Sequence, residues 1–359
     1  MRTAIFQFLI VLSCSISISC QSSAAEEMDN EDTVTNEKDN PTTDDENEEE
    51  TTSGTVVSLH GQLHVDGNRI LDKNDEEVQL RGMSFFWSQW IEGSKYYTPE
   101  TVAWLKKDWQ CTVVRAAMGI EDDGGYITDP EVNKQRVFTV IDAAIEQGIY
   151  VIVDWHSHHA EDYLEQSKAF FAEVAQKYGN TPNIIYEIYN EPLDTPAWNT
   201  VLKPYHEAVI KEIRKFDADN IIICGTRTWS QRVDEVIGNE INDENVAYTL
   251  HYYASSHKQE LRNIAKQALD NDIALFVTEY GTTEFTGNGT IDIAETNTWW
   301  DFLDENKISW CNWSVADKVE SASALKPNSS TTGDWTMEDL TQSGAMVRDE
   351  IKAQNQKFE

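Results

Sequence analysis

The chain has 359 residues, and its 28 Lys and Arg against 63 Asp and Glu give a net charge of -35. A charge this negative argues against nucleic acid or an anionic membrane surface as the main partner. Residues 21–54 carry 13 acidic side chains and one lysine, with Met28 as the single apolar residue larger than Val. Such a segment cannot bury enough surface to offset its ordering entropy, so we expect a disordered acidic linker there. Residues 55–359 keep a net charge of -24 and fit one large domain.

Residues 1–20 are expected to be an export signal. Arg2 precedes an apolar run that ends at Leu12, which is too short for a membrane span, and a Ser-rich stretch follows. The stretch ends at Cys20 after Ser-Ile-Ser, which resembles a bacterial lipoprotein signal whose cysteine is lipidated, and Cys14 is a second candidate. We therefore expect an exported protein with a lipid anchor at the cell surface or outer membrane, with plain secretion as the alternative.

Three further cysteines, Cys111, Cys224 and Cys311, each lie beside an apolar run. An odd number spread this widely has neither the pattern of a disulfide framework nor a metal-binding spacing. We expect buried free thiols.

The remaining chain begins with an expected hairpin and continues as a repeating strand and helix pattern. Residues 63–80 read as two short strands around Asp66-Gly67, a hairpin that would close one end of a barrel. Short apolar runs then alternate with amphipathic segments, which is typical of parallel strands with helical crossovers. The expected strands are 79–86, 112–118, 149–156, 184–191, 221–226, 246–253, 274–281 and 308–314, and the expected helices include 98–109, 131–148, 205–216 and a final 344–354.

Eight strands with helices between them match a (β/α)8 TIM barrel, an α/β fold. A doubly wound sheet is the alternative, but no Gly-rich phosphate turn follows the first strand. In a barrel the catalytic groups lie at the C-terminal ends of the strands.

Two glutamates, Glu191 and Glu279, end very apolar expected strands, where a charged side chain needs a reason to be kept. A carboxylate pair that flanks a bond is what glycoside hydrolysis requires. Arg115 and His251 would separate the two pKa values, so that Glu279 stays ionised and the partly buried Glu191 stays protonated. Asn190 would bind a sugar hydroxyl or orient the nucleophile, and a cap of the strand-to-helix turn is its alternative role.

Flat aromatic side chains near the strand ends suit a sugar ring, which presents faces of C–H groups. Trp90, Trp229, Trp310, Trp313 and Trp335 lie in such segments, whereas Trp104, Trp109, Trp299 and Trp300 lie in expected helices and are interpreted as packing residues.

A metal-dependent barrel hydrolase is a weaker alternative, suggested by the run from Asp154 to His159. A binuclear site needs further ligands on later strands, and His251 is the available one. A hydrogen-bonding role for His156, with His158 and His159 on the outgoing loop, is simpler.

The motifs IIYEIYNEP (184–192), VTEYGTT (277–283) and WCNWSVADKVESASAL (310–325) together resemble glycoside hydrolase family 5, in its bacterial endoglucanase branch. The resemblance covers residues 60–353. It implies a retaining endo-β-1,4-glucanase with Glu191 as acid/base and Glu279 as nucleophile, without a metal or cofactor, acting as a monomer on a β-glucan. It also implies that the cleaved bond is surrounded by Arg115, His156, Asn190, His251 and Tyr253. One glucose would rest on Trp313, and a more distant glucose would be bound by Lys318 and Glu320. The leaving-group side would be supported by Trp90 and Trp229.

Two positions depart from the family pattern. Phe86 stands where a substrate-binding His is usual, and Gly119 stands where a Tyr is common. Trp87 is a candidate to replace one of the lost contacts. These changes keep open the same chemistry on β-mannan, mixed-linkage glucan or xyloglucan. A carbohydrate-binding lipoprotein without activity is a further alternative, but it would need no paired glutamates.

Overall fold

The computed structural model describes residues 54–355. The expected export signal over 1–20, and the expected linker over 21–54 except for Gly54, lie outside the described residues. Among the helices within 54–355, none is long and apolar enough to cross a membrane.

Eight parallel strands form a closed barrel in the order β10-β3-β4-β5-β6-β7-β8-β9. This confirms the expected (β/α)8 architecture, and each strand begins within two residues of the predicted position. Because both faces of every strand are covered, the strand residues are almost all buried, which explains their continuous apolar sequences. The strands are β3 (Arg81–Phe85), β4 (Val113–Gly119), β5 (Tyr150–His156), β6 (Ile184–Glu187), β7 (Ile222–Cys224), β8 (Val246–Tyr253), β9 (Leu275–Gly281) and β10 (Trp310–Val315).

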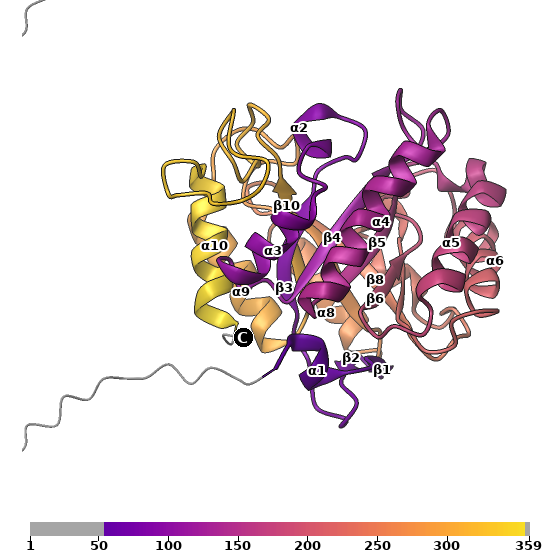
Figure 1. Ribbon diagram of the computed structural model, residues 1–359. Coiled ribbons are helices and arrows are strands. Elements are labelled where there is room, and N and C mark those ends of the chain that lie inside the picture. The colour runs from indigo at the N-terminus through magenta and orange to yellow at the C-terminus, as the bar shows by residue number, and fades with distance from the viewer. Residues whose placement is uncertain (1–53, 356–359) are drawn as a thin grey trace, which may run out of the picture. The chain divides into compact units, whose positions relative to one another are not determined.

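The helices cover the outside of the barrel (Figure 1). α3 begins at a Thr98 cap followed by Pro99, and α10 begins at a Thr341 cap, which are the residue types expected at these positions. The helices are α1 (Val56–His60), α2 (Ile91–Ser94), α3 (Pro99–Lys107), α4 (Pro130–Gln147), α5 (Leu164–Tyr178), α6 (Lys203–Ile213), α7 (Arg227–Ser230), α8 (Gln259–Leu269), α9 (Ile293–Glu305) and α10 (Gln342–Gln354), with shorter helical turns η1 (Ala160–Tyr163), η2 (Trp198–Leu202) and η3 (Val233–Val236).

The expected hairpin is present as β1 (His64–Asp66) paired antiparallel with β2 (Arg69–Leu71). It lies with α1 at the N-terminal end of the barrel, opposite α2 (Figure 1). The backbone N–H of Val65 donates to Asn245, just before β8, at 3.0 Å, and Tyr150 at the start of β5 donates to the carbonyl of Gly61 at 2.7 Å. These contacts close the floor of the barrel and leave the opposite end open.

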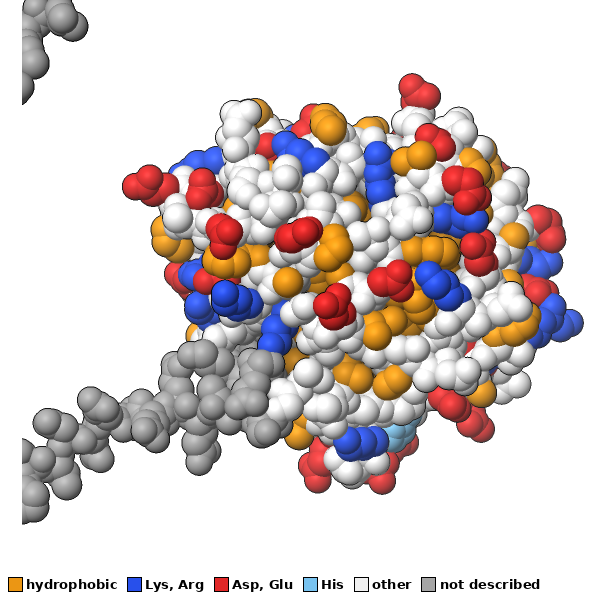
Figure 2. Space-filling model, viewed as in Figure 1, with side chains coloured by type: hydrophobic (Ala, Val, Ile, Leu, Met, Phe, Trp, Pro, Cys, Tyr) orange, Lys and Arg blue, Asp and Glu red, His pale blue; other side chains and the backbone are white. Residues whose placement is uncertain are grey.

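The core confirms two further expectations. Cys111, Cys224 and Cys311 are free and buried. Trp109, Trp299 and Trp300 are buried packing residues, as expected, and Trp104 is partly buried against the same core. The expectation that Trp310 and Trp335 offer a face to a sugar is wrong, because both are buried in the core and neither lines the cleft described below. On the face that Figure 2 shows, acidic, basic and apolar side chains are interspersed.

Candidate active site

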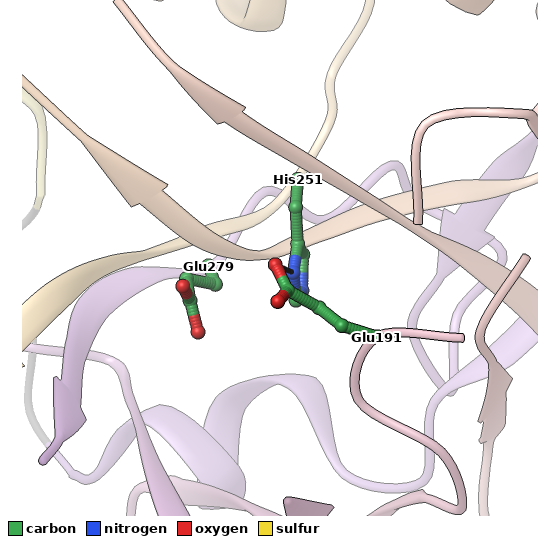
Figure 3. A group of neighbouring side chains, drawn as sticks. All are labelled: Glu191, His251 and Glu279. Atoms are coloured by element: carbon green, nitrogen blue, oxygen red, sulfur yellow. Dashed lines mark hydrogen bonds and ion pairs between the residues drawn. The ribbon is translucent and has the colours of Figure 1, made fainter. Parts of the chain in front are cut away.

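Glu191, His251 and Glu279 meet at the open end of the barrel (Figure 3). One side-chain atom from each lies within 4.8 Å of the others, so the two carboxylates approach at least that closely. His251 on β8 and Glu279 on β9 are register partners. Glu191 follows β6 by four residues. Its backbone N–H donates to the carbonyl of Ser157 at 3.2 Å, which holds this irregular segment against the residue that directly follows β5.

Glu279 is held by two donors. Nη1 of Arg115 lies 3.1 Å from one carboxylate oxygen, and the hydroxyl of Tyr253 donates to the other at 2.7 Å. Burial raises the pKa of Glu279 and the charge of Glu191 adds to this, while His251, Arg115 and Tyr253 act in the opposite direction. On balance the pKa of Glu279 is raised, so Arg115 and Tyr253 offset the effect of burial only in part.

Arg115 is the centre of a buried ion-pair network. Its Nε and Nη2 bind the carboxylate of Glu187 at 2.7 and 3.2 Å, and Nη2 also approaches Asp154 at 2.9 Å. The same Nη2 donates to Oδ1 of Asn190 at 2.7 Å. Arg115, Asp154 and Glu187 are fully buried. One guanidinium thus balances three carboxylates, and its own pKa rises because their attraction outweighs the effect of burial.

Glu191 has a histidine on each carboxylate oxygen. Nδ1 of His251 lies 2.9 Å from Oε1, and Nε2 of His158 lies 3.0 Å from Oε2. Although burial raises the pKa of Glu191, these two hydrogen bonds outweigh it and lower the pKa to about 2. His251 shows the converse, because the nearby carboxylates of Glu187, 3.7 Å away, and of Glu191 overcome burial and raise its pKa to about 9.

The expectation that burial keeps Glu191 protonated is therefore wrong for the unliganded site. Neighbouring donors, which the sequence does not place, decide its ionisation. Because the pKa of His251 is raised while that of Glu191 is lowered, we assign the shared proton to Nδ1 of His251, 2.9 Å from Glu191.

Thr278 connects the two halves of the site. Its hydroxyl donates to Glu187 at 2.6 Å and lies 2.8 Å from Nε2 of His251. A continuous path of hydrogen bonds therefore runs from Glu191 through His251, Thr278 and Glu187 to Arg115 and Glu279. Glu187, Thr278 and His158 were not among the expected site residues. For Glu187 the signal was a charged residue inside an apolar strand, the same signal that identified Glu191.

A cleft passes over the two carboxylates. It has two parts, and the carboxylates lie where these parts meet. His158, Glu191, Tyr253, Glu279 and Phe285 line both parts. The first part is further lined by Thr228, Trp229, Gln231, His251 and His257, and the second by Phe86, Trp87, Trp90, His156, Thr286, Gly287, Trp313, Lys318 and Glu320.

One expected grouping is incorrect. Trp90 lines the part of the cleft that holds Trp313 and Lys318, whereas Trp229 lines the other part. The reason is local, because the Trp90 ring packs at a tilt against Phe86 and Trp87, with ring centroids 5.8 and 4.8 Å apart.

The departure from the family pattern at Phe86 has a structural counterpart. Phe86 is buried beside Trp313, with ring centroids 5.3 Å apart, and Nζ of Lys318 lies 5.2 Å above the Phe86 ring. Lys318 also pairs with Glu320 at 2.5 Å. Trp87 contacts the ring of His156 edge-on at 4.2 Å. An aromatic and cationic wall thus occupies the place of a hydrogen-bonding histidine.

The run from Asp154 to His159 does not converge on one point. Nδ1 of His156 lies 2.6 Å from Asp154, and its ring stacks on Trp313 at 5.1 Å, while His158 binds Glu191. Glu191, His251 and Glu279 have ligand-type atoms close together, but the Arg115 cation lies 3.1 Å from Glu279 and opposes a metal ion there.

Comparison with known proteins gives a consistent result. The family description Cellulase (glycosyl hydrolase family 5) matches residues 71–319. Endoglucanase Z of Dickeya dadantii is 50% identical over 293 residues, which are 81% of this chain and 66% of that protein. The chain thus spans about two thirds of the length of that relative.

Two solved structures are also similar. One from Cytophaga hutchinsonii has a TM-score of 0.82 and 54% identity, and the match covers 84% of this chain and 97% of that one. The catalytic domain of a Thermobifida fusca endoglucanase, solved in complex with cellotetraose, has a TM-score of 0.79 and 35% identity, and the match covers 83% and 100% of the two chains.

Proposed function

The chain belongs to glycosyl hydrolase family 5, and we propose that it is a retaining endo-β-1,4-glucanase with Glu279 as nucleophile and Glu191 as acid/base. The approach of the two carboxylates to within 4.8 Å carries the proposal. Retaining enzymes place their carboxyl groups about 5–5.5 Å apart, whereas inverting enzymes need roughly 6.5–9.5 Å to admit a water molecule. Similarity to endoglucanases over most of the chain supports the substrate class.

In the first step, Glu279 attacks the anomeric carbon while Glu191 gives its proton to the departing glycosidic oxygen, forming a glycosyl-enzyme ester. In the second step, Glu191 removes a proton from water, which attacks the same carbon and releases Glu279. Arg115 and Tyr253 orient the Glu279 carboxylate and favour its charged form. His251 supplies the proton that Glu191 needs before the first step, since it holds it at 2.9 Å.

The remaining polar groups are proposed to bind the glucan. Asn190 uses Oδ1 to accept from Arg115, while its Nδ2 has no partner among residues 54–355 and is available for a sugar hydroxyl. Trp90, His156, Trp313, Lys318 and Glu320 would hold the sugars on one side of the cleaved bond, and Trp229 would hold those on the other. A cleft that continues on both sides of the carboxylates suits cleavage inside a chain.

The buried position of Phe86 favours one second candidate, the same chemistry on β-mannan, mixed-linkage glucan or xyloglucan. Without a hydrogen-bonding histidine, the wall of Phe86, Trp87 and Trp313 selects sugar hydroxyls less strictly. Reducing-end release from a panel of soluble β-glucans and β-mannan separates the two. Full activity after chelation is expected, and loss of activity would support the metal-dependent alternative.

Product stereochemistry tests the mechanism. Proton NMR of fresh cellotetraose hydrolysate should show the β-anomer first. An initial α-anomer would establish inversion and contradict the nucleophile role of Glu279. Glu279→Gln and Glu191→Gln should each remove nearly all turnover without unfolding the barrel, and retained turnover in either would contradict its assignment. If turnover is absent in the unmodified protein, the non-catalytic carbohydrate-binding alternative is supported.

We also propose that residues 1–20 are an export signal and that Cys20 carries a lipid anchor. Fatty-acid labelling in a bacterial host should depend on Cys20 and disappear in Cys20→Ala, whereas dependence on Cys14 would move the site. If no fatty acid is attached at either cysteine and the protein is found in the medium, the protein is secreted without an anchor. Size-exclusion chromatography with light scattering tests the expected monomer.

A further inference from the structure

We propose that His158 is a positioning residue for Glu191, and that substrate binding moves one Glu191 oxygen from His158 to the glycosidic oxygen. The inference rests on the proposed function and deepens it, because it concerns the proposed acid/base carboxyl. The His158 side chain lies on the loop that follows β5, and it lines both parts of the cleft.

The hydrogen bonds of Glu191 leave neither oxygen unoccupied. His251 binds Oε1 at 2.9 Å and His158 binds Oε2 at 3.0 Å. A general acid must present a protonated oxygen to the leaving group, and a donor that approaches this oxygen from the cleft competes with the glycosidic oxygen for that position. His251 is 1% exposed at its side chain and is fixed from behind by Thr278, whereas the side chain of His158 is 32% exposed. The His158 bond is therefore the one that opens toward the cleft.

The backbone of His158 is held in place on both sides. Its N–H donates to Oε1 of Glu121 at 2.9 Å, and its carbonyl accepts from the hydroxyl of Tyr189 at 2.9 Å. The ring lies near Trp87, with centroids 6.0 Å apart. The loop is thus held by the segments that follow β4 and β6. Its backbone can stay in place while the imidazole moves away from Glu191 and returns after each turnover.

The charges around His158 define its effect on pH dependence. Glu121, Glu191 and Glu279 face it with negative charge, and His156 and His251 are the neighbouring imidazoles. The pKa of His158 is raised, since its hydrogen bond to Glu191 overcomes burial. In return, the bond favours ionised Glu191 and lowers the pH at which the Glu191 and His251 pair loses its shared proton.

Two aryl β-cellobiosides distinguish this role from a purely structural one. One carries a phenol of low pKa, whose departure needs no proton, and the other a phenol of high pKa, whose departure needs acid assistance. For His158→Ala we expect kcat/KM to fall about tenfold on the second substrate, a fraction of the 10²–10⁴ that general acid catalysis contributes. On the first substrate the change should be less than about twofold. The alkaline limb of kcat/KM should move to higher pH.

Matched variants complete the test. His158→Gln keeps a neutral donor and should recover part of the lost rate, while His159→Ala, the exposed neighbouring histidine, should behave like the unmodified protein. Thermal unfolding of all variants checks the fold. Equal losses on both substrates with an unmoved alkaline limb, or no loss on either, would overturn the proposal. Glu191→Gln measured in parallel tests the proposed function separately, because it should show the leaving-group dependence whatever His158 does.

Discussion

Arg115 and Glu279 form an ion pair at 3.1 Å in which neither side chain is more than 6% exposed. The pair joins β4 to β9 across the barrel, and the same guanidinium is shared with Glu187 and Asp154. Removing one partner of such a buried network leaves uncompensated charge, which is far more costly than losing a surface ion pair.

Glu187→Gln should lower kcat with little change in KM. Glu187 is connected to Glu279 through Arg115 and to Glu191 through Thr278 and His251, but it does not line the cleft. With one negative charge removed, Arg115 acts more strongly on Glu279 and lowers its pKa, and His251 loses a stabilising neighbour. Both limbs of the kcat/KM profile should therefore move to lower pH. Stability should fall by about 3–5 kcal/mol, measured by denaturant unfolding. A loss of stability with unmoved limbs would restrict Glu187 to a structural role.

Thr278→Val separates the two arms of this network. The change removes the hydroxyl between Glu187 and His251 but leaves the bonds of Arg115 intact. The alkaline limb alone should move to lower pH, with the acid limb unchanged, in the same kcat/KM measurement. Movement of both limbs would show that Arg115 depends on Thr278.

The Glu191 and His251 pair should also make stability depend on pH. The pKa of His251 rises from 6.5 to about 9, so its contribution is complete below the unfolded value and is lost as pH rises toward 9. The pKa of Glu191 falls from 4.5 to about 2, so its contribution is complete above 4.5 and is lost as pH falls toward 2. His251→Asn should therefore cost more unfolding free energy near pH 5.5 than near pH 9.5, by on the order of 1–3 kcal/mol. An equal cost at both pH values would contradict the shifted pKa of His251.

Trp90 and Trp229 form a matched pair, 36% and 41% exposed, on opposite parts of the cleft. Each change to Ala should lower kcat/KM on a soluble glucan by roughly tenfold, as expected for one aromatic platform, with little effect on stability. With end-labelled cellopentaose, the two variants should shift the cleavage position in opposite directions. Shifts in the same direction would show that both residues serve one side.

Gly119 leaves room for the side chain of Gln89. A Cβ at position 119 would lie 1.8 Å from Oε1 of Gln89, whose amide is buried. Gly119→Ala should therefore destabilise the protein by about 1–3 kcal/mol, and adding Gln89→Ala should recover most of the loss. A double-mutant cycle with thermal unfolding measures this coupling, and additive effects would contradict the clash.

The barrel could be predicted from the sequence because eight buried parallel strands leave continuous apolar runs. Glu191 and Glu279 were identified because they stand where two of these runs end. The sequence could not predict which donors reach each carboxylate. Glu187 was missed because the expected strand ran on to Glu191, whereas β6 ends at Glu187 and the chain then bends toward Ser157. The side of the cleft on which Trp90 lies depended on its packing against Phe86 and Trp87, which strand spacing does not determine.

The floor that α1 and the β1–β2 hairpin form has a consequence for orientation. The described chain begins there, at the end of the barrel away from α2 (Figure 1), whereas Glu279 lies near the C-terminal end of β9. Attachment through this floor itself, to a surface or a chromatographic support, would leave the mouth of the barrel facing away from the attachment. A polymer too large to pass around the protein would then still meet the catalytic end first.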